Sequence, residues 1–389
     1  MKSPISKNIR LLSIAFLFLF LGFDGVQQYV TTFFVQAGLP AIGFKSLILV
    51  YLFFILGDPL SAIFVSKYGA KKSMILGGMS YSLFIFALTT KVILLVYIAS
   101  ILLGIGASLL WTGQTTFLTK MTTGKNRGKS AGFFGGILYL GSATGIIIIG
   151  FLITKFSYNL PFLFAITPTV ISLFLLGKLK DLPPGKSKNH FLLLKRVIVS
   201  KTVWRFSLIW FATFFVNGLA LGIIPLEIIK IMGIGYVGYL SSLFYIVPIL
   251  VTFWAGKLSD TKGRKIILLL AFLISFIGVI LLYFSHQAFT LISGIVLIAL
   301  FFSMMYPLTL ALAGDVATKS NLEYLTAFFW MIRNVGIVSA LVLSTFIQTK
   351  IIYIISVAVL GATIVILTPL IVNNFSIIKR KISLEMNYK

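Results

Sequence analysis

The sequence predicts an all-α integral membrane protein with twelve transmembrane helices in two six-helix repeats. Three observations support this prediction. The chain is 59% hydrophobic and 11% charged, whereas a soluble domain has about 25% charged residues. Twelve apolar runs have the length of a membrane-spanning helix, about 20 residues. A short basic turn also occurs twice, once around Gly69 and once around Gly263. The two glycines are 194 residues apart in a chain of 389.

The composition also excludes several classes of protein. A net charge of +25 is typical of a nucleic-acid-binding protein, but the basic residues lie in short loops between apolar runs, so we expect no nucleic-acid partner. The chain has no cysteine, which excludes disulfides and thiolate metal sites. His190 and His286 are too few for a histidine-based site. We therefore expect no metal, no cofactor and no enzyme activity.

The predicted spans are helices, because backbone groups in lipid must form their hydrogen bonds within one segment. The alternation with a period of two residues that marks a membrane barrel is absent. In order, the spans cover residues 11–34, 44–66, 73–90, 92–118, 131–154, 159–177, 204–229, 237–256, 266–285, 288–314, 324–347 and 351–373.

The longest break between spans divides the chain into two halves. It covers residues 178–203, which are polar and rich in lysine. We predict an N-terminal six-helix bundle over 1–177, a cytoplasmic linker over 178–203, and a C-terminal six-helix bundle with a short cytoplasmic tail over 204–389. The FLLLKRVIV segment of the linker predicts a short amphipathic helix on the membrane surface.

The distribution of Lys and Arg predicts the orientation of the spans. With the N-terminus inside, 27 of the 33 basic residues lie in cytoplasmic segments and 5 lie in outer loops. We therefore expect a multi-pass protein of the cell (plasma) membrane with both termini and both copies of the basic turn in the cytoplasm.

The second copy of the basic turn, GKLSDTKGRK, resembles the signature loop of the major facilitator superfamily of transporters. Thr261 stands where a basic residue is usual. The first copy departs further, because Ser66 replaces the Asp and Ala70 replaces an Arg. The residues of the second copy that match the signature are Gly256, Asp260, Gly263, Arg264 and Lys265.

A second resemblance covers about the first 140 residues. LGIGASLLWTGQTTFLT in the fourth span, FLGFDGVQQYV in the first, and the KYGAKKSMILGG turn resemble the Unc-type ion-channel-regulatory branch of the superfamily. The second half resembles only the wider superfamily. Family membership implies two six-helix bundles around a central cavity lined by the first, fourth, seventh and tenth spans.

Ionisable residues inside spans are the sharpest functional signal, since a charge in lipid costs about 2.5–3.5 kcal/mol on insertion scales. Asp24, Asp58 and Arg333 occupy such positions. Asp24 is the best candidate for proton or cation coupling. The second and eleventh spans face each other in the superfamily, so we predict that Asp58 and Arg333 form an ion pair that closes the cytoplasmic side. The alternative is that both side chains point into a water-filled cavity without contacting each other.

Polar and aromatic side chains in the same spans predict a substrate pocket. Trp111 and Gln114 are three residues apart and share one helical face. For most of the aromatic residues, packing or lipid contact is the favoured alternative, and Trp111 is the exception because it lies in the branch motif. Glycines such as Gly141 and Gly145 indicate close helix packing. The predicted substrate and coupling residues are Asp24, Gln27, Gln28, Trp111, Gln114, Asn217, Tyr306, Trp330 and Asn334.

The predicted gating residues include those of the signature turn. In relatives, the Asp at the position of Asp260 contacts the start of a helix of the other bundle, where the helix dipole favours an anion. Here that helix is the fifth span, which begins near Lys129. Asp315 and Glu323 are expected to be solvated, and Glu227 and Lys230 to form a weak surface pair. The predicted gating set is Asp58, Arg333, Gly256, Asp260, Gly263, Arg264 and Lys265.

These observations predict a secondary active transporter that moves a small organic solute by alternating access, with protons as a candidate coupling ion. The segment TGKNRGKS at 123–130 resembles a phosphate-binding loop, but its spacing fails and the required strand is missing, so we expect no nucleotide partner. The expected partners are the small-molecule substrate and the lipid bilayer. The alternative is a non-transporting membrane protein that regulates a channel or another membrane partner.

Overall fold

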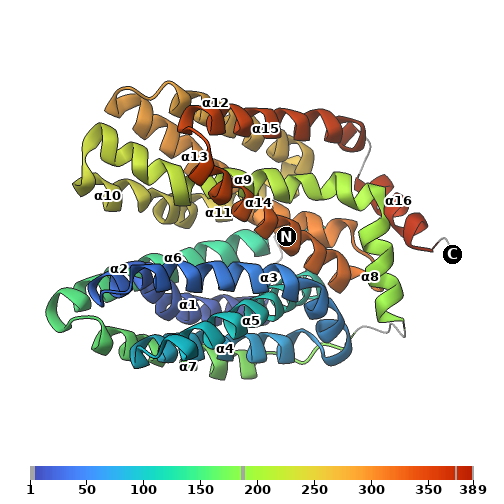
Figure 1. Cartoon of the computed structure of the whole chain (residues 1–389). Coiled ribbons are helices and arrows are strands. Elements are labelled where there is room, and N and C mark those ends of the chain that lie inside the picture. Colours follow the sequence, from blue (N-terminus) through green and yellow to red (C-terminus); the bar gives the residue numbers. More distant parts are fainter. Residues whose placement is uncertain (1–4, 185–188, 373–374, 388–389) are drawn as a thin grey trace. The chain divides into compact units, whose positions relative to one another are not determined.

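The computed structural model describes residues 5–184, 189–372 and 375–387. Within these ranges the chain is helical and has no strand, which confirms the predicted all-α class. Figure 1 shows the helices in chain order. They are α1 (Lys7–Gln27), α2 (Val30–Gln36), α3 (Pro40–Tyr68), α4 (Ala70–Thr90), α5 (Ile93–Lys120), α6 (Arg127–Phe156), α7 (Asn159–Gly177), α8 (His190–Val199), α9 (Lys201–Met232), the 3-10 helix Ile234–Tyr236, α10 (Val237–Ser241), α11 (Leu243–Lys262), α12 (Arg264–Tyr283), α13 (Ala288–Val316), α14 (Leu322–Phe346), α15 (Thr349–Val372) and α16 (Phe375–Asn387).

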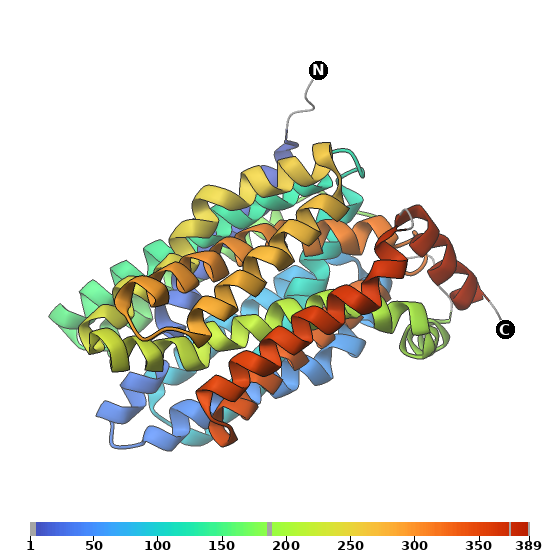
Figure 2. The same ribbon diagram turned by 90° about the horizontal axis from the view of Figure 1, so that it is seen from above.

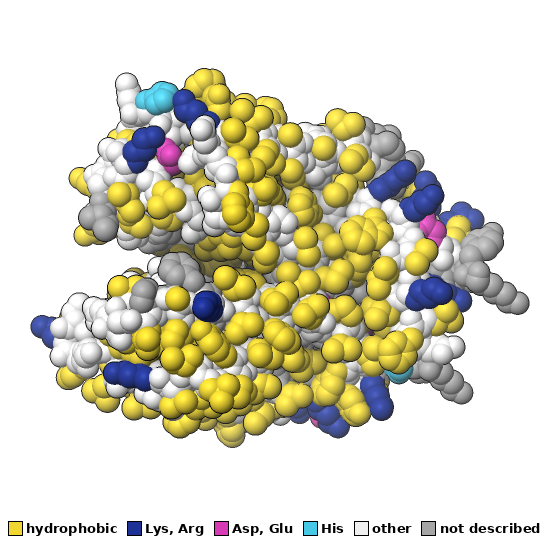
Figure 3. Space-filling model, viewed as in Figure 1, with side chains coloured by type: hydrophobic (Ala, Val, Ile, Leu, Met, Phe, Trp, Pro, Cys, Tyr) yellow, Lys and Arg dark blue, Asp and Glu magenta, His cyan; other side chains and the backbone are white. Residues whose placement is uncertain are grey.

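The twelve predicted spans are confirmed. Among the described residues, twelve helical segments are long and apolar enough to cross a membrane. The first combines α1 and α2, and the eighth covers α10 and α11 as Val237–Lys262. On the face drawn in Figure 3, hydrophobic side chains cover most of the surface and Lys and Arg lie toward its edges. Such a surface matches a chain surrounded by lipid.

The chain divides into two compact units. Unit 1 contains Met1–Met121 and Ile137–His190, and unit 2 contains Thr122–Gly136 and Phe191–Lys389. The first turns of α6 therefore group with the C-terminal half of the chain. Their contacts with α11 and α13 build the charge cluster described below.

Unit 1 is held together by close packing between its helices. α5 packs against both α3 and α4, and α7 packs against α1 and α4. A side chain on Gly141 or Gly145 of α6 would overlap with the backbone carbonyls of Leu17 and Leu21 in α1. The packing function predicted for these glycines is therefore confirmed.

Unit 2 is built around three long helix pairs. α9 packs against α14, and α13 packs against both α11 and α12. The predicted helix in the linker is present as α8. Figures 1 and 2 both draw α16 beside the junction of α8 and α9, and the contacts of Glu385 hold it there.

The Glu385 carboxylate joins α16 to the beginning of α9. It accepts hydrogen bonds from the hydroxyl groups of Ser200 and Thr202 and from the backbone N–H of Thr202. Burial alone would raise the pKa of Glu385, but these hydrogen bonds and the nearby charge of Arg205 outweigh it and place the pKa below its usual value. The ionised form of Glu385 is therefore the one that caps α9.

Each copy of the basic turn consists of one glycine between two helices. Gly69 separates α3 from α4 with φ 89° and ψ 159°, and Gly263 separates α11 from α12 with φ 95° and ψ 146°. A positive φ is accessible to glycine without strain, which explains why both copies have it. The predicted break between the spans 237–256 and 266–285 is too wide, since Asp260 lies in the last turn of α11 and Arg264 begins α12.

Candidate functional site

Asp260 binds the beginning of α6, as the family resemblance predicts. Its Oδ1 accepts a hydrogen bond of 2.9 Å from the backbone N–H of Gly128, and its Oδ2 accepts one of 2.6 Å from the backbone N–H of Lys129. These N–H groups belong to the first turn of the helix, where they have no partner within the helix. The carboxylate therefore satisfies two free donors and interacts favourably with the positive end of the helix dipole.

Asp315 completes a cluster of charges around Asp260. Arg264 donates from Nη1 to Asp260 Oδ1 at 2.6 Å and from Nε to Asp315 Oδ2 at 2.8 Å. Asp315 also forms an ion pair with Arg127. We call these four side chains the Asp260–Asp315 cluster. Two carboxylates balance two guanidinium groups, and all four side chains are at most 15% exposed.

The sequence prediction for Asp315 is therefore wrong. Its side chain was expected to be solvated, but it lies between two arginines at the end of α13. Glu323 was expected to be solvated as well and is only 1% exposed. Arg127 was missed as a functional candidate. Lys265, which the signature includes, is exposed.

The signature glycine Gly256 allows α11 and α6 to touch. A side chain there would overlap with the carbonyl oxygen of Gly128, and a side chain on Gly132 would overlap with the carbonyl oxygen of Thr252. The backbones of the two helices therefore approach closely at two successive levels. This approach brings the N–H groups of α6 within reach of Asp260.

The first copy of the turn lacks this cluster. Ser66, at the position of Asp260, is 1% exposed, and its hydroxyl group makes no hydrogen bond with another described residue. Ala70 takes the position of Arg264. The charge contact of this copy is Lys71 with Asp181 at 3.3 Å, where the Asp181 side chain is 77% exposed. Pairs of this kind contribute little to stability, about 0–1 kcal/mol.

Arg333 lies between two aromatic rings in unit 2. Its guanidinium carbon is 4.1 Å from the ring centre of Phe214 in α9 and 4.4 Å from that of Trp330 in α14. Its Nη1 donates to the Oδ1 of Asn334 at 3.3 Å. Cation–π contacts contribute about 0.5–2 kcal/mol each, the larger values applying when the cation is desolvated. Three predicted residues, Trp330, Arg333 and Asn334, are thus brought together.

The other predicted residues of unit 2 lie on neighbouring helices. Tyr306 of α13 is 8% exposed, and a side chain on Gly135 of α6 would come within 2.7 Å of its ring. Asn217 of α9 is half-buried. Their assignment to a substrate pocket stays a prediction.

Asp24 lies in α1 beside α6 in unit 1. It is half-buried, and its carboxylate lies next to the hydroxyl group of Ser142, which also donates to the Leu138 carbonyl at 3.3 Å. Gln27 ends α1, and the exposed Gln28 occupies the break before α2. Asp24 is therefore inside the first span, whereas the two glutamines lie where its helix is interrupted.

Trp111 belongs to an aromatic cluster of unit 1. Its ring centre lies 5.6 Å from that of Phe16 and 5.3 Å from that of Phe20. Gln114, on the same face of α5, is fully buried, and its Oε1 accepts a hydrogen bond from Thr115. Its Nε2 makes no hydrogen bond with another described residue. Trp111 thus makes packing contacts, and its contact with substrate stays a prediction.

Asp58 is fully buried in α3. The helix is held close to α5 here, because a side chain on Gly57 would come within 2.7 Å of the Ser108 hydroxyl and Ser61 donates to Thr112 at 2.8 Å. Asp58 belongs to unit 1 and Arg333 to unit 2. The ion pair between them stays a prediction from the resemblance.

These features define a class of protein: a multi-pass membrane protein with twelve spans, charged residues inside them, and a helix-capping acid next to a glycine turn. The chain belongs to the Major Facilitator Superfamily, which it matches over residues 12–237 and 206–381. The described residues contain no group of three or more His, Cys, Asp or Glu that could hold a metal ion.

Curated relatives match a limited part of the chain. The chain is 31% identical over 153 residues to UNC93-like protein MFSD11 of Xenopus tropicalis. This match covers 38% of the chain and 34% of that protein. It is 29% identical over 137 residues to UNC93-like protein 3 of Arabidopsis thaliana. This second match covers 34% of the chain and 28% of that protein. The matches thus span about a third of these relatives. They agree with the predicted relationship to the Unc-type branch.

Solved structures share the fold over nearly the whole chain. The proton:xylose symporter XylE superposes with a TM-score of 0.77 at 14% identity, covering 95% of this chain and 97% of that chain. The human organic anion transporter MFSD10 superposes with a TM-score of 0.76 at 14% identity, covering 94% and 100%. At this identity the likeness establishes the fold alone.

Proposed function

We propose that this protein is a secondary active transporter that moves a small organic solute across the membrane by alternating access. The observation that carries the proposal is Arg333, a charge kept inside a spanning helix between the rings of Phe214 and Trp330. A charge inside a span is expensive and usually serves function. Rings and amides around it provide a surface that can bind a polar organic molecule.

Asp24 is the proposed coupling residue. It lies inside the first span next to a serine hydroxyl, and a carboxylate in such surroundings can exchange a proton with its two aqueous sides in turn. XylE, which shares the fold, is named as a proton symporter. The fold supports transport of small molecules in general, and the choice of protons rests on Asp24.

The Asp260–Asp315 cluster is the proposed gating element. Its four charges join α6, α11, α12 and α13 at the level of the signature turn. We propose that the cluster and both termini lie on the cytoplasmic side of the plasma membrane, because the loops on this side hold most of the basic residues. Breaking and forming these ion pairs would accompany each change of conformation.

A second candidate function is regulation of a channel or another membrane protein without transport. The observation that favours it is the similarity to UNC93-like proteins, which lies within about a third of their length. A regulator has no need for charges inside its spans. The presence of Asp24, Asp58 and Arg333 within spans therefore places transport first.

Proteoliposomes test the proposal directly. The purified protein is reconstituted with a pH-sensitive dye inside, and pools of amino acids, sugars, organic cations and organic anions are added outside. We expect one pool to drive a proton flux that the Asp24→Asn variant loses. Asp181→Asn is the matched control, because it removes a carboxylate that is 77% exposed, and it should retain the flux.

The result that would overturn transport is also defined. If no pool produced flux of protons or of labelled solute, and none raised the melting temperature of the protein, the regulatory function would take its place. Solute uptake without proton flux would support the transport function but contradict the proposal that Asp24 couples transport to protons.

A further inference from the structure

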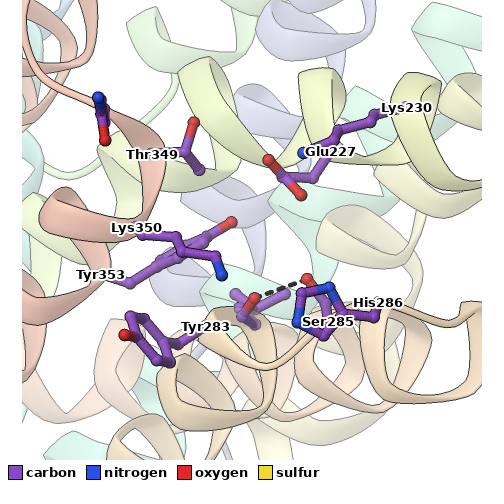
Figure 4. Close-up of a pocket in the computed structure, with 10 residues that line it drawn as sticks. Glu227, Lys230, Tyr283, Ser285, His286, Thr349, Lys350 and Tyr353 are labelled. Atoms are coloured by element: carbon purple, nitrogen blue, oxygen red, sulfur yellow. Dashed lines mark hydrogen bonds between the residues drawn. The ribbon is translucent and has the colours of Figure 1, made fainter.

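A cavity that is partly open to the surroundings lies at one end of unit 2. It has a volume of about 390 Å³ and is bounded by the ends of α9 and α12 and the beginning of α15 (Figure 4). This volume is within the range of small-molecule sites, about 300–1,000 Å³. Because α12 runs from Arg264 to Tyr283, the cavity lies at the end opposite to the signature turn. None of the proposed transport residues lines it.

Tyr353 provides a polar group that the protein itself leaves unpaired. The residue is 2% exposed, and its hydroxyl group makes no hydrogen bond with another described residue. Figure 4 shows this hydroxyl group pointing into the cavity. A buried hydroxyl without a partner is destabilising, by about 1–3 kcal/mol. The oxygen has less than 1 Å² of accessible surface, so a ligand in the cavity would supply the missing hydrogen bond once a neighbouring side chain moved aside.

Both signs of charge surround the cavity. Glu227 and Lys230 line it from α9, Lys350 from α15, and His286 from the segment after α12. The surface pair predicted for Glu227 and Lys230 is wrong, because no ion pair joins them in the described part of the chain. In Figure 4 the Glu227 carboxylate, the Lys350 ammonium group and the His286 ring turn toward the same space as the Tyr353 hydroxyl.

The charges restrict the chemistry of a ligand. A simple anion would be attracted by Lys230 and Lys350 but repelled by Glu227, and a simple cation would meet the opposite arrangement. A zwitterion with separated charges suits both. The N-terminus of α15 also faces the cavity, because the helix begins at Thr349, which lines it. A helix N-terminus favours a phosphate group.

The cavity also lies at the depth of lipid headgroups. Tyr353 is four residues after Thr349, the first residue of both α15 and the twelfth span, which is about 6 Å at 1.5 Å per residue. Tyr and Lys are common at this level of a membrane protein, and Lys350 lies over the ring of Tyr283 at 5.8 Å. An acyl chain attached to the ligand could extend along the apolar surface below.

We infer that this cavity binds a phosphoethanolamine group, with Glu227 facing the ammonium, Lys350 and the start of α15 facing the phosphate, and the Tyr353 hydroxyl donating to a phosphate oxygen. The inference goes beyond transport and uses none of its residues. The group can come from a phosphatidylethanolamine headgroup or from a free solute such as glycerophosphoethanolamine, and the two sources are separable by experiment.

Native mass spectrometry of the full-length protein tests the inference. Detergent-purified protein is titrated with phosphatidylethanolamine, with phosphatidylglycerol of the same acyl chains, and with glycerophosphoethanolamine. We expect phosphatidylethanolamine to bind at least tenfold more tightly than phosphatidylglycerol. Glu227→Gln should abolish this preference, and Tyr353→Phe should weaken phosphatidylethanolamine binding about tenfold, as expected for one hydrogen bond to a charged group. Tyr239→Phe is the matched control, since Tyr239 is 76% exposed, and it should change nothing.

The outcomes divide cleanly. Binding of the lipid without binding of glycerophosphoethanolamine identifies a membrane source, and comparable binding of both identifies a soluble one. Equal affinity of the wild-type protein for the two lipids, with no binding of the soluble compound, would overturn the inference. Unchanged affinities in both Glu227→Gln and Tyr353→Phe would also overturn it. The circular dichroism of each variant verifies that its helices are retained.

Discussion

Replacing Asp315 by Asn should strongly destabilise unit 2. The change leaves Arg127 and Arg264 next to each other with one carboxylate, Asp260, so the cluster acquires a net positive charge. Removing one partner of a buried ion pair typically costs about 3–5 kcal/mol. An Asn at 315 can still accept one of the two hydrogen bonds, so we expect the lower end, about 3 kcal/mol. This is about two orders of magnitude in the ratio of folded to unfolded protein.

Denaturant unfolding in detergent micelles, followed by tryptophan fluorescence, measures this loss. Asp181→Asn is the matched control, because it removes the same group from an ion pair in which Asp181 is 77% exposed. The control should change the free energy of unfolding by at most about 1 kcal/mol. Both variants lose one carboxylate charge, so a difference between their free energies of unfolding reports the effect of burying Asp315.

A double-mutant cycle separates the contribution of the Arg127–Asp315 pair. Combining Arg127→Gln with Asp315→Asn removes one charge of each sign and restores electroneutrality. We expect the double variant to be more stable than the sum of the single losses by about 1–3 kcal/mol. Equal destabilisation by Asp315→Asn and Asp181→Asn, or strict additivity in the cycle, would refute the reasoning.

Three further predictions follow from other parts of the chain. Gly256→Ala should destabilise the protein by about 1–3 kcal/mol through overpacking, whereas Gly361→Ala, which has open space around it, should be neutral or slightly stabilising in the same unfolding assay. Glu385→Gln should lower stability at neutral pH. This difference should shrink progressively as the pH falls below the ordinary pKa of a glutamate, because a carboxylate with a lowered pKa loses its stabilising effect as it becomes protonated. If Asp58 and Arg333 form the predicted ion pair, the double variant Asp58→Arg, Arg333→Asp should transport faster than either single variant. Equal transport rates of the three variants would contradict the predicted pair.

The spans and the basic turns could be predicted from the sequence because their signals are local. A run of apolar residues long enough to cross lipid has few alternatives to a helix, and the twelve predicted runs match twelve observed segments. The boundaries were less accurate at the second turn, where residues 257–262 continue α11. Hydropathy falls at the charged residues of this stretch, but its backbone remains helical up to Gly263.

Asp315 shows what local patterns miss. Its partners lie 51 and 188 residues away in the sequence, and they come together only through the packing of α6, α12 and α13. Hydropathy and helix periodicity carry no information about such distances. One signal was available, since the chain has 8 acidic residues against 33 basic ones. An acid that is rare and lies at the end of a span, on the side of the signature turn, is a strong candidate for pairing with its arginines.

The two copies of the turn separate the backbone requirement from the electrostatic one. Gly69 and Gly263 have nearly the same dihedral angles, although Asp260 has a serine, Ser66, as its counterpart in the first copy. The glycine is therefore required by the sharp reversal between two helices, whatever charges surround it. The acid and the arginine serve a separate purpose in the second copy, where Asp260 accepts hydrogen bonds from the N–H groups that begin α6 and pairs with Arg264. The signature motif thus combines two independent requirements, and in this chain only the second copy meets both.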